Sequence, residues 1–500
     1  MKNKLSIKIE DFWSKTFLDQ KLNNWLGYVL IFSIAAVLGY LLAQNTVVGF
    51  GITGIVISAA VIITCLLSTE AGLYINVVYS FFAFHFSRFF FHDTFPVGVA
   101  SDVLVVATLF SLFVRRISLK NTVNQFTKTS VAICILFLFF YLFIELFNPY
   151  AHSFEGWYQT FRKMLGAVFV LFVSFHVFSN YRSIKRFITL LFIVCTIAGI
   201  YGCIQQWHGL FSFERDWVMA DANRFALTYI DGDFRKFSTM SDPTAYAIIM
   251  ASCSIFFLVI AWNQKKASTK IILIIGSIFM LLGMAYSGTR TANAMVIGGL
   301  LIFILLTLNK KSTQIFAVIS ILIFLVLMYG PFYSSPTINR FRTTFSSSDA
   351  SFNVREANRK FIQPYIYSHP FGGGLCTTGA GGLRFNPDHY LAGFPPDSGY
   401  LKKALETGWM GLALICILYF LITKTGIKGY FSTKNEHIKV MYAAATAAIF
   451  SFYVAEFSQD AIGQITDLVV YYPLIAIILK MKYFNQINRF SHETDHASFI

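Results

Sequence analysis

The sequence has little charge for its length: only 13% of its 500 residues are Asp, Glu, Lys or Arg. Soluble domains carry about 25% charged residues, so this composition excludes a soluble globular protein. Hydrophobic residues make up 56% of the chain and aromatic residues 17%. Surplus apolar surface of this kind faces lipid, where exposed strand edges would leave backbone groups unsatisfied. We therefore expect an all-α, polytopic membrane protein.

Cysteine is also scarce, and its placement excludes a disulfide framework. Six of the seven cysteines fall inside apolar runs, and only Cys376 lies in a polar segment. The first 24 residues hold five Lys but no short apolar stretch with a small-residue cleavage site. We expect no removable signal peptide, and the first apolar run is then a membrane anchor.

Apolar runs long enough to cross a hydrocarbon core of roughly 30 Å predict about 12 to 14 transmembrane helices. They lie near residues 25–43, 47–67, 72–91, 97–114, 129–147, 164–179, 187–207, 244–262, 271–287, 292–308, 315–330, 409–423, 440–458 and 465–481. Three regions follow. Residues 1–330 hold helices 1 to 11 with a secondary outer loop near 207–242, residues 331–408 form a large extracytoplasmic loop with short helices, and residues 409–500 hold the last helices and a cytoplasmic tail.

Basic residues are distributed unequally between the two sides of these spans. With the N-terminus inside, the inner segments hold 24 Lys and Arg against 7 acidic residues, and the outer segments hold 16 against 18. This pattern follows the positive-inside rule and predicts that both termini are cytoplasmic. The net charge of +15 therefore indicates contact with membrane lipids, and we expect no nucleic-acid partner.

The kind of basic residue differs as well. The inner segments hold 19 Lys and 5 Arg, whereas the outer segments hold 5 Lys and 11 Arg. Anchoring to anionic headgroups needs only a point charge, but a forked guanidinium suits bidentate binding of phosphate or carboxylate. We infer that something anionic is handled on the outer face.

The large loop contains two segments that suit anion binding. Residues 351–362 predict a helix in which Arg355 and Arg359 share one face, as an anion clamp or as a solvated face. His369-Pro-Phe-Gly-Gly-Gly and the glycines after Thr377 follow. Their backbone amides either cradle phosphate or form plain turns.

Other polar residues lie near predicted helix ends. Asp397 precedes an amphipathic helix that ends at Gly408, and is either its cap or a carboxylate aimed at an outer cavity. Ser287-Gly-Thr-Arg290 ends the ninth span, and an Arg at membrane level normally faces a cavity or a partner. Pairing with an Arg is the alternative to a functional role for three acids, Asp102, Glu145 and Glu456. No set of side chains suggests a metal site.

Several of these segments, in this order, resemble one family. Ser287-Gly-Thr-Arg290, the helix that carries Arg355, His369-Pro-Phe-Gly-Gly-Gly and Glu406-Thr-Gly-Trp-Met-Gly411 are similar to the O-antigen ligase and polymerase superfamily of bacterial membrane glycosyltransferases. Asp242-Pro-Thr-Ala-Tyr resembles the same family's segment at that place. The resemblance covers roughly residues 190 to 425.

The resemblance implies an enzyme of the bacterial cytoplasmic membrane. Such an enzyme transfers an undecaprenyl-diphosphate-linked glycan to an acceptor glycan on the outer face, without a metal or another cofactor. A system of this kind also implies a flippase and a chain-length regulator as partners. Ligases of the family carry His-Asn where this chain has Asp397-Ser398, and an Asp there is more similar to the polysaccharide polymerases.

By this resemblance Arg290 and Arg355 bind the diphosphate, whose developing charge preorganised guanidiniums would stabilise. Asp397 could then take the proton from the acceptor hydroxyl, with inversion at the anomeric carbon. Further candidates for binding phosphate or glycan are Arg359, Arg215, Arg224, Arg340, Arg342 and Arg384, and the candidates for stacking on sugar rings are Tyr400, Tyr365 and Trp217.

Other functions stay open at this point. Within the same chemistry, the acceptor could be a Ser or Thr of a protein, as in an O-oligosaccharyltransferase, or a lipid A core. From another class, a flippase of lipid-linked oligosaccharides would have a similar number of spans. Transporters of that kind are usually built from repeated halves with a site near the midplane. Charge displaced to the outer face and one dominant loop favour the enzyme.

Overall fold

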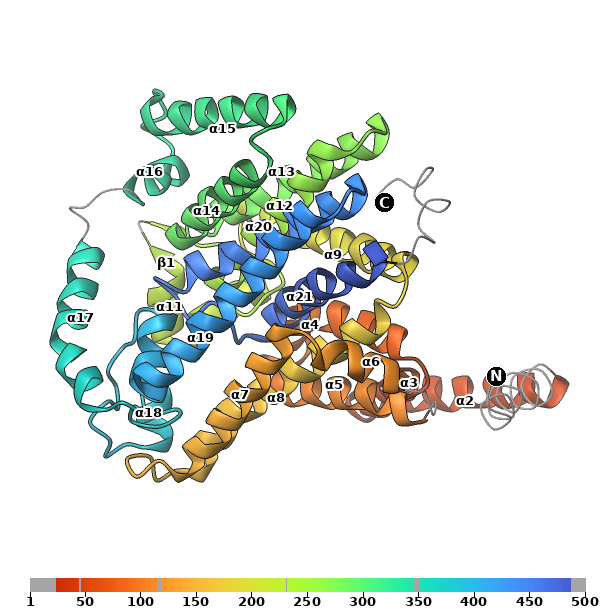
Figure 1. Ribbon diagram of the computed structural model, residues 1–500. Helices are drawn as coiled ribbons and strands as arrows, with labels where there is room; N and C mark the ends of the chain where they lie inside the picture. The colour runs from red at the N-terminus through yellow and green to blue at the C-terminus, as the bar shows by residue number, and fades with distance from the viewer. Residues whose placement is uncertain (1–23, 45, 115–118, 231, 345–349, 487–500) are drawn as a thin grey trace. The chain divides into compact units, whose positions relative to one another are not determined.

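The computed structural model describes residues 24–44, 46–114, 119–230, 232–344 and 350–486, and most of them are helical (Figure 1). The chain divides into two compact units, residues 1–75 with 103–121 and residues 76–102 with 122–500. The predicted cytoplasmic termini lie outside the described residues.

The first unit is built from the N-terminal helices. It contains α2 (Trp25–Gln44), α3 (Thr46–Leu67), the start of α4 (Thr69–Phe91) and most of α5 (Val97–Val114). Helices α2 and α3 pack against each other. The hydroxyls of Thr69 and Ser111 share a buried hydrogen bond of 2.6 Å, which joins the start of α4 to α5.

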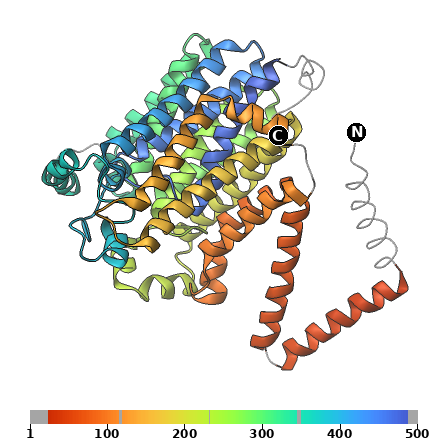
Figure 2. The ribbon, with the colours of Figure 1, turned by 60° about the horizontal axis from the view of Figure 1, so that its bottom comes forward.

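The second unit holds the rest of the chain, and its long helices run alongside one another (Figure 2). Its elements are α6 (Lys120–Thr127), α7 (Ser130–Ile144), a 3-10 turn (Glu145–Phe147), α8 (Phe154–Val177), α9 (Tyr181–Trp207), α10 (Ser212–Met219), α11 (Ala222–Thr228), β1 (Tyr229–Ile230), β2 (Asp233–Phe234), α12 (Pro243–Asn263), α13 (Ala267–Tyr286), α14 (Arg290–Thr307), α15 (Lys311–Tyr329), α16 (Pro336–Thr343), α17 (Ala350–Ser368), α18 (Gly379–Phe385), α19 (Gly399–Ser432), α20 (Glu436–Ala455) and α21 (Ile465–Gln486). The strands β1 and β2 form a small antiparallel hairpin.

Helices α12 and α20 form the core of the second unit. Their apolar stretches are 89% and 83% buried, respectively, as expected for helices that are hydrophobic on all sides. Helix α12 packs against α9, α13, α14, α20 and α21, and α20 also packs against α14, α19 and α21. The ends of these central helices therefore lie close together, and the candidate site is built there.

The predicted spans agree with the helices, and the all-α polytopic fold is confirmed. Each of the fourteen apolar runs coincides with a helix. Ten helices of the described residues are long and apolar enough to cross a membrane, and α2 and α3 contribute shorter apolar stretches, Trp25–Val37 and Gly51–Leu67. Helices α4 and α21 carry buried charged residues, Arg88 in α4 and Asp467 and Lys480 in α21.

The segment between α15 and α19 contains the expected short helices. Helix α17 confirms the predicted helix of residues 351–362 and continues to Ser368. The amphipathic helix predicted to end at Gly408 does break there, and the next span follows directly, so that α19 consists of two helical parts on either side of Gly408. Gly408 has φ +66° and marks a kink in this helix. The position requires glycine, because a β-carbon there would overlap the carbonyl oxygen of Pro370.

Candidate functional site

Several helix ends meet at the irregular segment between α20 and α21, which we call the junction segment (Glu456–Gln464). The carbonyl oxygen of Glu456 accepts a hydrogen bond of 3.0 Å from Ser398 Oγ at the start of α19. The carbonyl oxygen of Phe457 accepts one of 2.7 Å from Arg359 of α17. Ser458 Oγ and Thr291 Oγ1, in the first turn of α14, lie 2.7 Å apart. Three consecutive residues thus contact the three segments that carry Arg359, Asp397 and Arg290.

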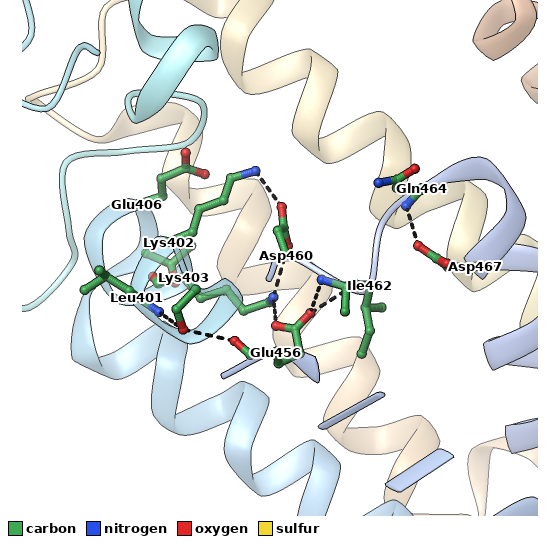
Figure 3. A network of polar contacts seen from close by, with 12 residues as sticks. Leu401, Lys402, Lys403, Glu406, Glu456, Asp460, Ile462, Gln464 and Asp467 are labelled. Carbon is green, nitrogen blue, oxygen red and sulfur yellow. Dashed lines mark hydrogen bonds and ion pairs between the residues drawn. The ribbon is translucent and has the colours of Figure 1, made fainter. Parts of the chain in front are cut away.

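Charged side chains hold the junction segment in place (Figure 3). Glu456 is fully buried and pairs with Lys403, while its Oε1 accepts 3.0 Å hydrogen bonds from two amides, those of Ala461 and Ile462. Lys402 pairs with Asp460 at 2.8 Å, and Lys403 lies 3.5 Å from the same carboxylate. Burial acts to raise the pKa of Asp460, but Lys403 and Lys402 outweigh it and hold that pKa at about 2.

Arg290 is the first residue of α14, and the loop before it is fixed by another arginine, Arg235. The Arg235 guanidinium donates to the carbonyl oxygen of Ser287 and to Thr289 Oγ1, both at 2.8 Å. Gly288 between them has φ +63°, a conformation that suits glycine. The motif that begins at Ser287 is therefore a fixed turn that places Arg290 at the first position of α14.

A small pocket that is open to solvent lies beside this turn. Arg235, Gly288 and Arg340 are among its lining residues, and the Arg340 side chain packs against Gly288. Burial first and then the neighbouring charge of Arg340 lower the pKa of Arg235 to about 10, although Asp242 opposes the shift. Both arginines therefore lie at the turn that directly precedes Arg290, which gives this turn a strongly basic environment that suits an anion.

Arg355 and Arg359 lie one turn apart on α17, as predicted. Arg359 has its guanidinium over the Phe457 ring at 4.4 Å in addition to its hydrogen bond to the junction segment. Arg355 is half-buried and, among the described residues, has no hydrogen-bond or ion-pair partner. Of the two, Arg355 is the side chain that keeps its donors for a ligand.

Asp397 is not the cap of α19, so that alternative was wrong. Ser398 is the N-cap, and its hydroxyl accepts from the amide of Leu401 at 3.4 Å. A side chain that caps the helix must lie at this position, and Asp397 is one residue too early. The Asp397 carboxylate is half-buried and has no partner among the described residues, beside a backbone anchored to Glu456.

Other predicted arginines lie elsewhere or bind the protein itself. Arg342 donates to the carbonyl oxygens of Leu327 and Gly330 and so closes the end of α15. Arg224 pairs with Asp93 at 3.6 Å. Two more, Arg215 and Arg384, are exposed on α10 and α18. The structure does not bring these four to the junction segment.

The predicted aromatic residues have partners within the protein. Trp217 donates to Asp93 at 2.8 Å, and the guanidiniums of both Arg224 and Arg88 lie over its ring. Tyr365 is stacked on His369 at 3.9 Å and on Tyr390 at 5.4 Å, and Tyr400 donates to the carbonyl oxygen of Tyr453. Burial raises the pKa of Tyr365 to about 12, with the nearby Tyr150 and Tyr390 adding to the shift. Tyr390, which is 65% exposed, is the ring of this stack that is accessible.

The glycine-rich segment forms turns against α19. The amide of Gly373 donates to the carbonyl oxygen of Leu405 at 2.8 Å, and that of Gly374 donates to Glu406 at 3.0 Å. Thr378 Oγ1 donates to the buried Glu406 carboxylate at 2.5 Å. These amides are therefore engaged by the protein, which agrees with the plain-turn alternative for the first glycine run.

Pairing with an arginine, one of the two alternatives for the three acids, holds for one of them. Asp102 pairs with Arg162 at 3.2 Å. Glu145 instead accepts from Asn148 at 2.8 Å, and Glu456 pairs with Lys403, so an arginine partner was wrong for both. Among the described residues, no three His, Cys, Asp or Glu side chains are arranged to hold a metal ion.

Sequence reasoning missed Arg235, Lys402, Lys403 and Asp460. A usable signal existed for the two lysines, because Lys is rare in the predicted outer segments and these two are adjacent there. For Arg235 and Asp460 no local pattern exists, since their partners are 52 to 58 residues distant along the chain.

The long apolar helices indicate a multi-pass membrane protein, and the pocket beside the turn before Arg290 is lined by two arginines. Residues 275–416 match a family model described as O-antigen ligase. This match lies within the part of the chain, roughly residues 190 to 425, that resembles the O-antigen ligase and polymerase superfamily, and it confirms that resemblance. The match supports a ligase or polymerase type of function on lipid-linked glycans. No curated protein matches the chain.

Proposed function

We propose that the protein is a metal-independent glycosyltransferase that polymerises oligosaccharide repeat units linked to an isoprenoid diphosphate, at the outer face of the bacterial cytoplasmic membrane. The observation that carries this proposal is the convergence of three segments on Glu456, Phe457 and Ser458, because the segments bear Arg290, Arg359 and Asp397. Arg290, Arg359 and Asp397 all fall within the region that matches the family model.

In this proposal the arginines bind the diphosphate of the donor. Arg290 and Arg355 provide the principal guanidiniums, with Arg359 beside them. Negative charge grows on the diphosphate as the glycosidic bond breaks, and fixed guanidiniums in a water-poor site stabilise that charge without reorganising. The adjacent pair Arg235 and Arg340 adds positive potential at the same turn.

Asp397 acts as the general base. The acceptor hydroxyl oxygen forms a bond to the anomeric carbon while the bond from that carbon to the diphosphate oxygen breaks. The hydroxyl proton moves to the Asp397 carboxylate, and the electron pair leaves with the diphosphate. Attack opposite the leaving group inverts the anomeric centre.

The acceptor is then a second lipid-linked glycan. Asp397-Ser398 in place of the ligases' His-Asn supports the polymerase branch. In such a system a flippase delivers the repeat units and a chain-length regulator acts on the product. Transfer to a protein Ser or Thr, or to a lipid A core, uses the same donor chemistry and differs only in the nucleophile.

The test uses the purified full-length protein, lipid-linked repeat units and gel analysis of the products. We expect a ladder of glycan lengths. Transfer of a single glycan to an added protein or lipid A core, with no ladder, would contradict polymerisation and support ligation. Repeat units that stay unchanged in all three assays would remove the glycosyltransferase from consideration.

A further inference from the structure

The junction segment lies outside the region of the family match, yet it contacts three parts of the proposed active site. Residues 275–416 match the family, whereas the junction segment begins at Glu456. Its contacts with α14, α17 and α19 come from consecutive residues, so a displacement of one contact moves the other two. No regular secondary structure fixes this segment, because α20 ends at Ala455 and α21 begins at Ile465.

Side chains replace secondary structure in holding the segment. A buried irregular backbone must satisfy its polar groups with other partners. The Glu456 carboxylate does this for the amides of Ala461 and Ile462, and Lys403 neutralises its charge. Gly399 also takes part, since its amide donates to the carbonyl oxygen of Gln459 and a β-carbon on it would overlap the Glu456 carboxylate.

We propose that Glu456–Asp460 is the positioning segment of the active site, which sets the distance between the arginines that bind diphosphate and the carboxylate that takes the proton. The proposal rests on the proposed function. The reacting groups sit on separate helices, and misplacement by about 1 Å can cost roughly a hundredfold in rate. The segment acts through Arg290, Arg359 and Asp397 and touches no substrate itself.

The bond between Thr291 and Ser458 tests this role, because it joins two side chains and neither belongs to the binding or catalytic groups. We compare Thr291→Val, Ser458→Ala and the double variant with Ser451→Ala as the matched control. Ser451 is a buried serine of α20, the helix that precedes the junction segment, and its hydroxyl donates to the carbonyl oxygen of Ala448 within that helix.

The two single variants are expected to lower kcat for glycan transfer about tenfold, with KM for the donor within twofold of the wild-type value. The double variant should be no slower than either single one, since all three lose the same bond. Ser451→Ala should keep the wild-type kcat. Unchanged kcat in the single variants would overturn the positioning role. So would a normal kcat together with a raised KM for the donor.

Amide hydrogen exchange provides a second readout that needs no activity. Ser458→Ala should raise exchange in residues 287–292 and leave the rest of α14 as in the wild type, whereas Ser451→Ala should change neither. Unaltered exchange at residues 287–292 would overturn the proposal even if kcat fell. If the wild-type protein transferred no glycan, the proposed function would fail, and exchange would still decide whether the segment orders this turn.

Discussion

Arg290 and Arg355 are placed differently from the arginines that stabilise the protein itself. Arg342 is engaged by the end of α15 and Arg224 by Asp93 and Trp217, so both stabilise the protein itself. Arg290 starts a helix on a turn that Arg235 fixes, and Arg355 has no partner among the described residues. The fixed turn restricts where Arg290 can lie, and Arg355 keeps its donors available for bidentate binding of phosphate.

Replacing these two residues should therefore remove catalysis without unfolding the protein. Arg290→Ala and Arg355→Ala are each expected to slow glycan transfer by about a hundredfold or more, as the loss of a preorganised charge donor does. The measurement is the rate of ladder formation by purified variants at equal amounts in the membrane. Wild-type chain lengths from both variants would exclude the clamp.

Asp397 gives a separate prediction because it acts on the acceptor and not on the donor. Asp397→Asn keeps the size of the side chain but cannot take a proton. We expect turnover at least about a hundredfold slower, with the donor affinity unchanged. The assay is kcat beside equilibrium binding of the donor. Since Ser398 caps the helix, normal turnover would leave Asp397 without any role that the structure identifies.

The ion pairs of Asp460 make stability depend on pH in a definite direction. Its pKa in the folded protein is about 2, below the ordinary value of about 3.9 for Asp. The stabilisation is thus present above pH 4 and is lost as the pH falls from about 4 toward 2. Melting temperatures measured between pH 6 and 3 should fall less steeply for Asp460→Asn than for the wild type. Parallel curves would contradict the pairing.

At the scale of elements, α19 depends on one glycine. Gly408 has φ +66° and lies against the carbonyl oxygen of Pro370, so a β-carbon has neither a suitable backbone conformation nor space. Gly408→Ala should destabilise the protein by about 3 kcal/mol. The control is Gly166→Ala in α8, where a β-carbon meets no atom within 4 Å and no loss is expected. Thermal unfolding in detergent distinguishes the two, and equal melting temperatures would contradict the kink.

The sequence predicts the elements well because hydropathy is a local property. Long apolar runs identified the spans, and the spacing of Arg355 and Arg359 identified α17. The break at Gly408 was also predicted, but the contact with Pro370 that excludes a β-carbon there could not be, because Pro370 lies 38 residues away. The cap was one of two alternatives for Asp397, and the structure places it one residue later, at Ser398, because either residue fits the local pattern.

At the scale of the whole molecule, the distribution of charge predicts which side each segment faces. Residues 331–408 should lie outside and the turn between α19 and α20 inside. Asp388 is exposed in the first region and Lys434 in the second, so the variants are Asp388→Cys and Lys434→Cys. A membrane-impermeant thiol reagent added to spheroplasts should label only the former, relative to the chain with its native cysteines. Labelling of Lys434→Cys alone would invert the topology.

The arrangement of the site is the part that the sequence could not predict. The resemblance selected Arg290, Arg355 and Asp397, but nothing local connects them to residues 456–460, which lie about 60 residues or more further along the chain. The sequence places Lys402 and Lys403 in an amphipathic helix. Only the structure identifies their acidic partners, Asp460 and Glu456. Long-range pairing of this kind leaves no periodic signal.

Binding of an isoprenoid diphosphate to the purified protein tests the central claim most directly. The variants are Arg290→Ala, Arg355→Ala and, as a control from the same helix as Arg355, Lys360→Ala, whose charge pairs with Glu356 at the surface. We predict that the wild type and Lys360→Ala bind equally and that both arginine variants bind at least about tenfold more weakly, the loss expected for one charged hydrogen-bonding partner. Equal affinity in all four proteins would contradict the account.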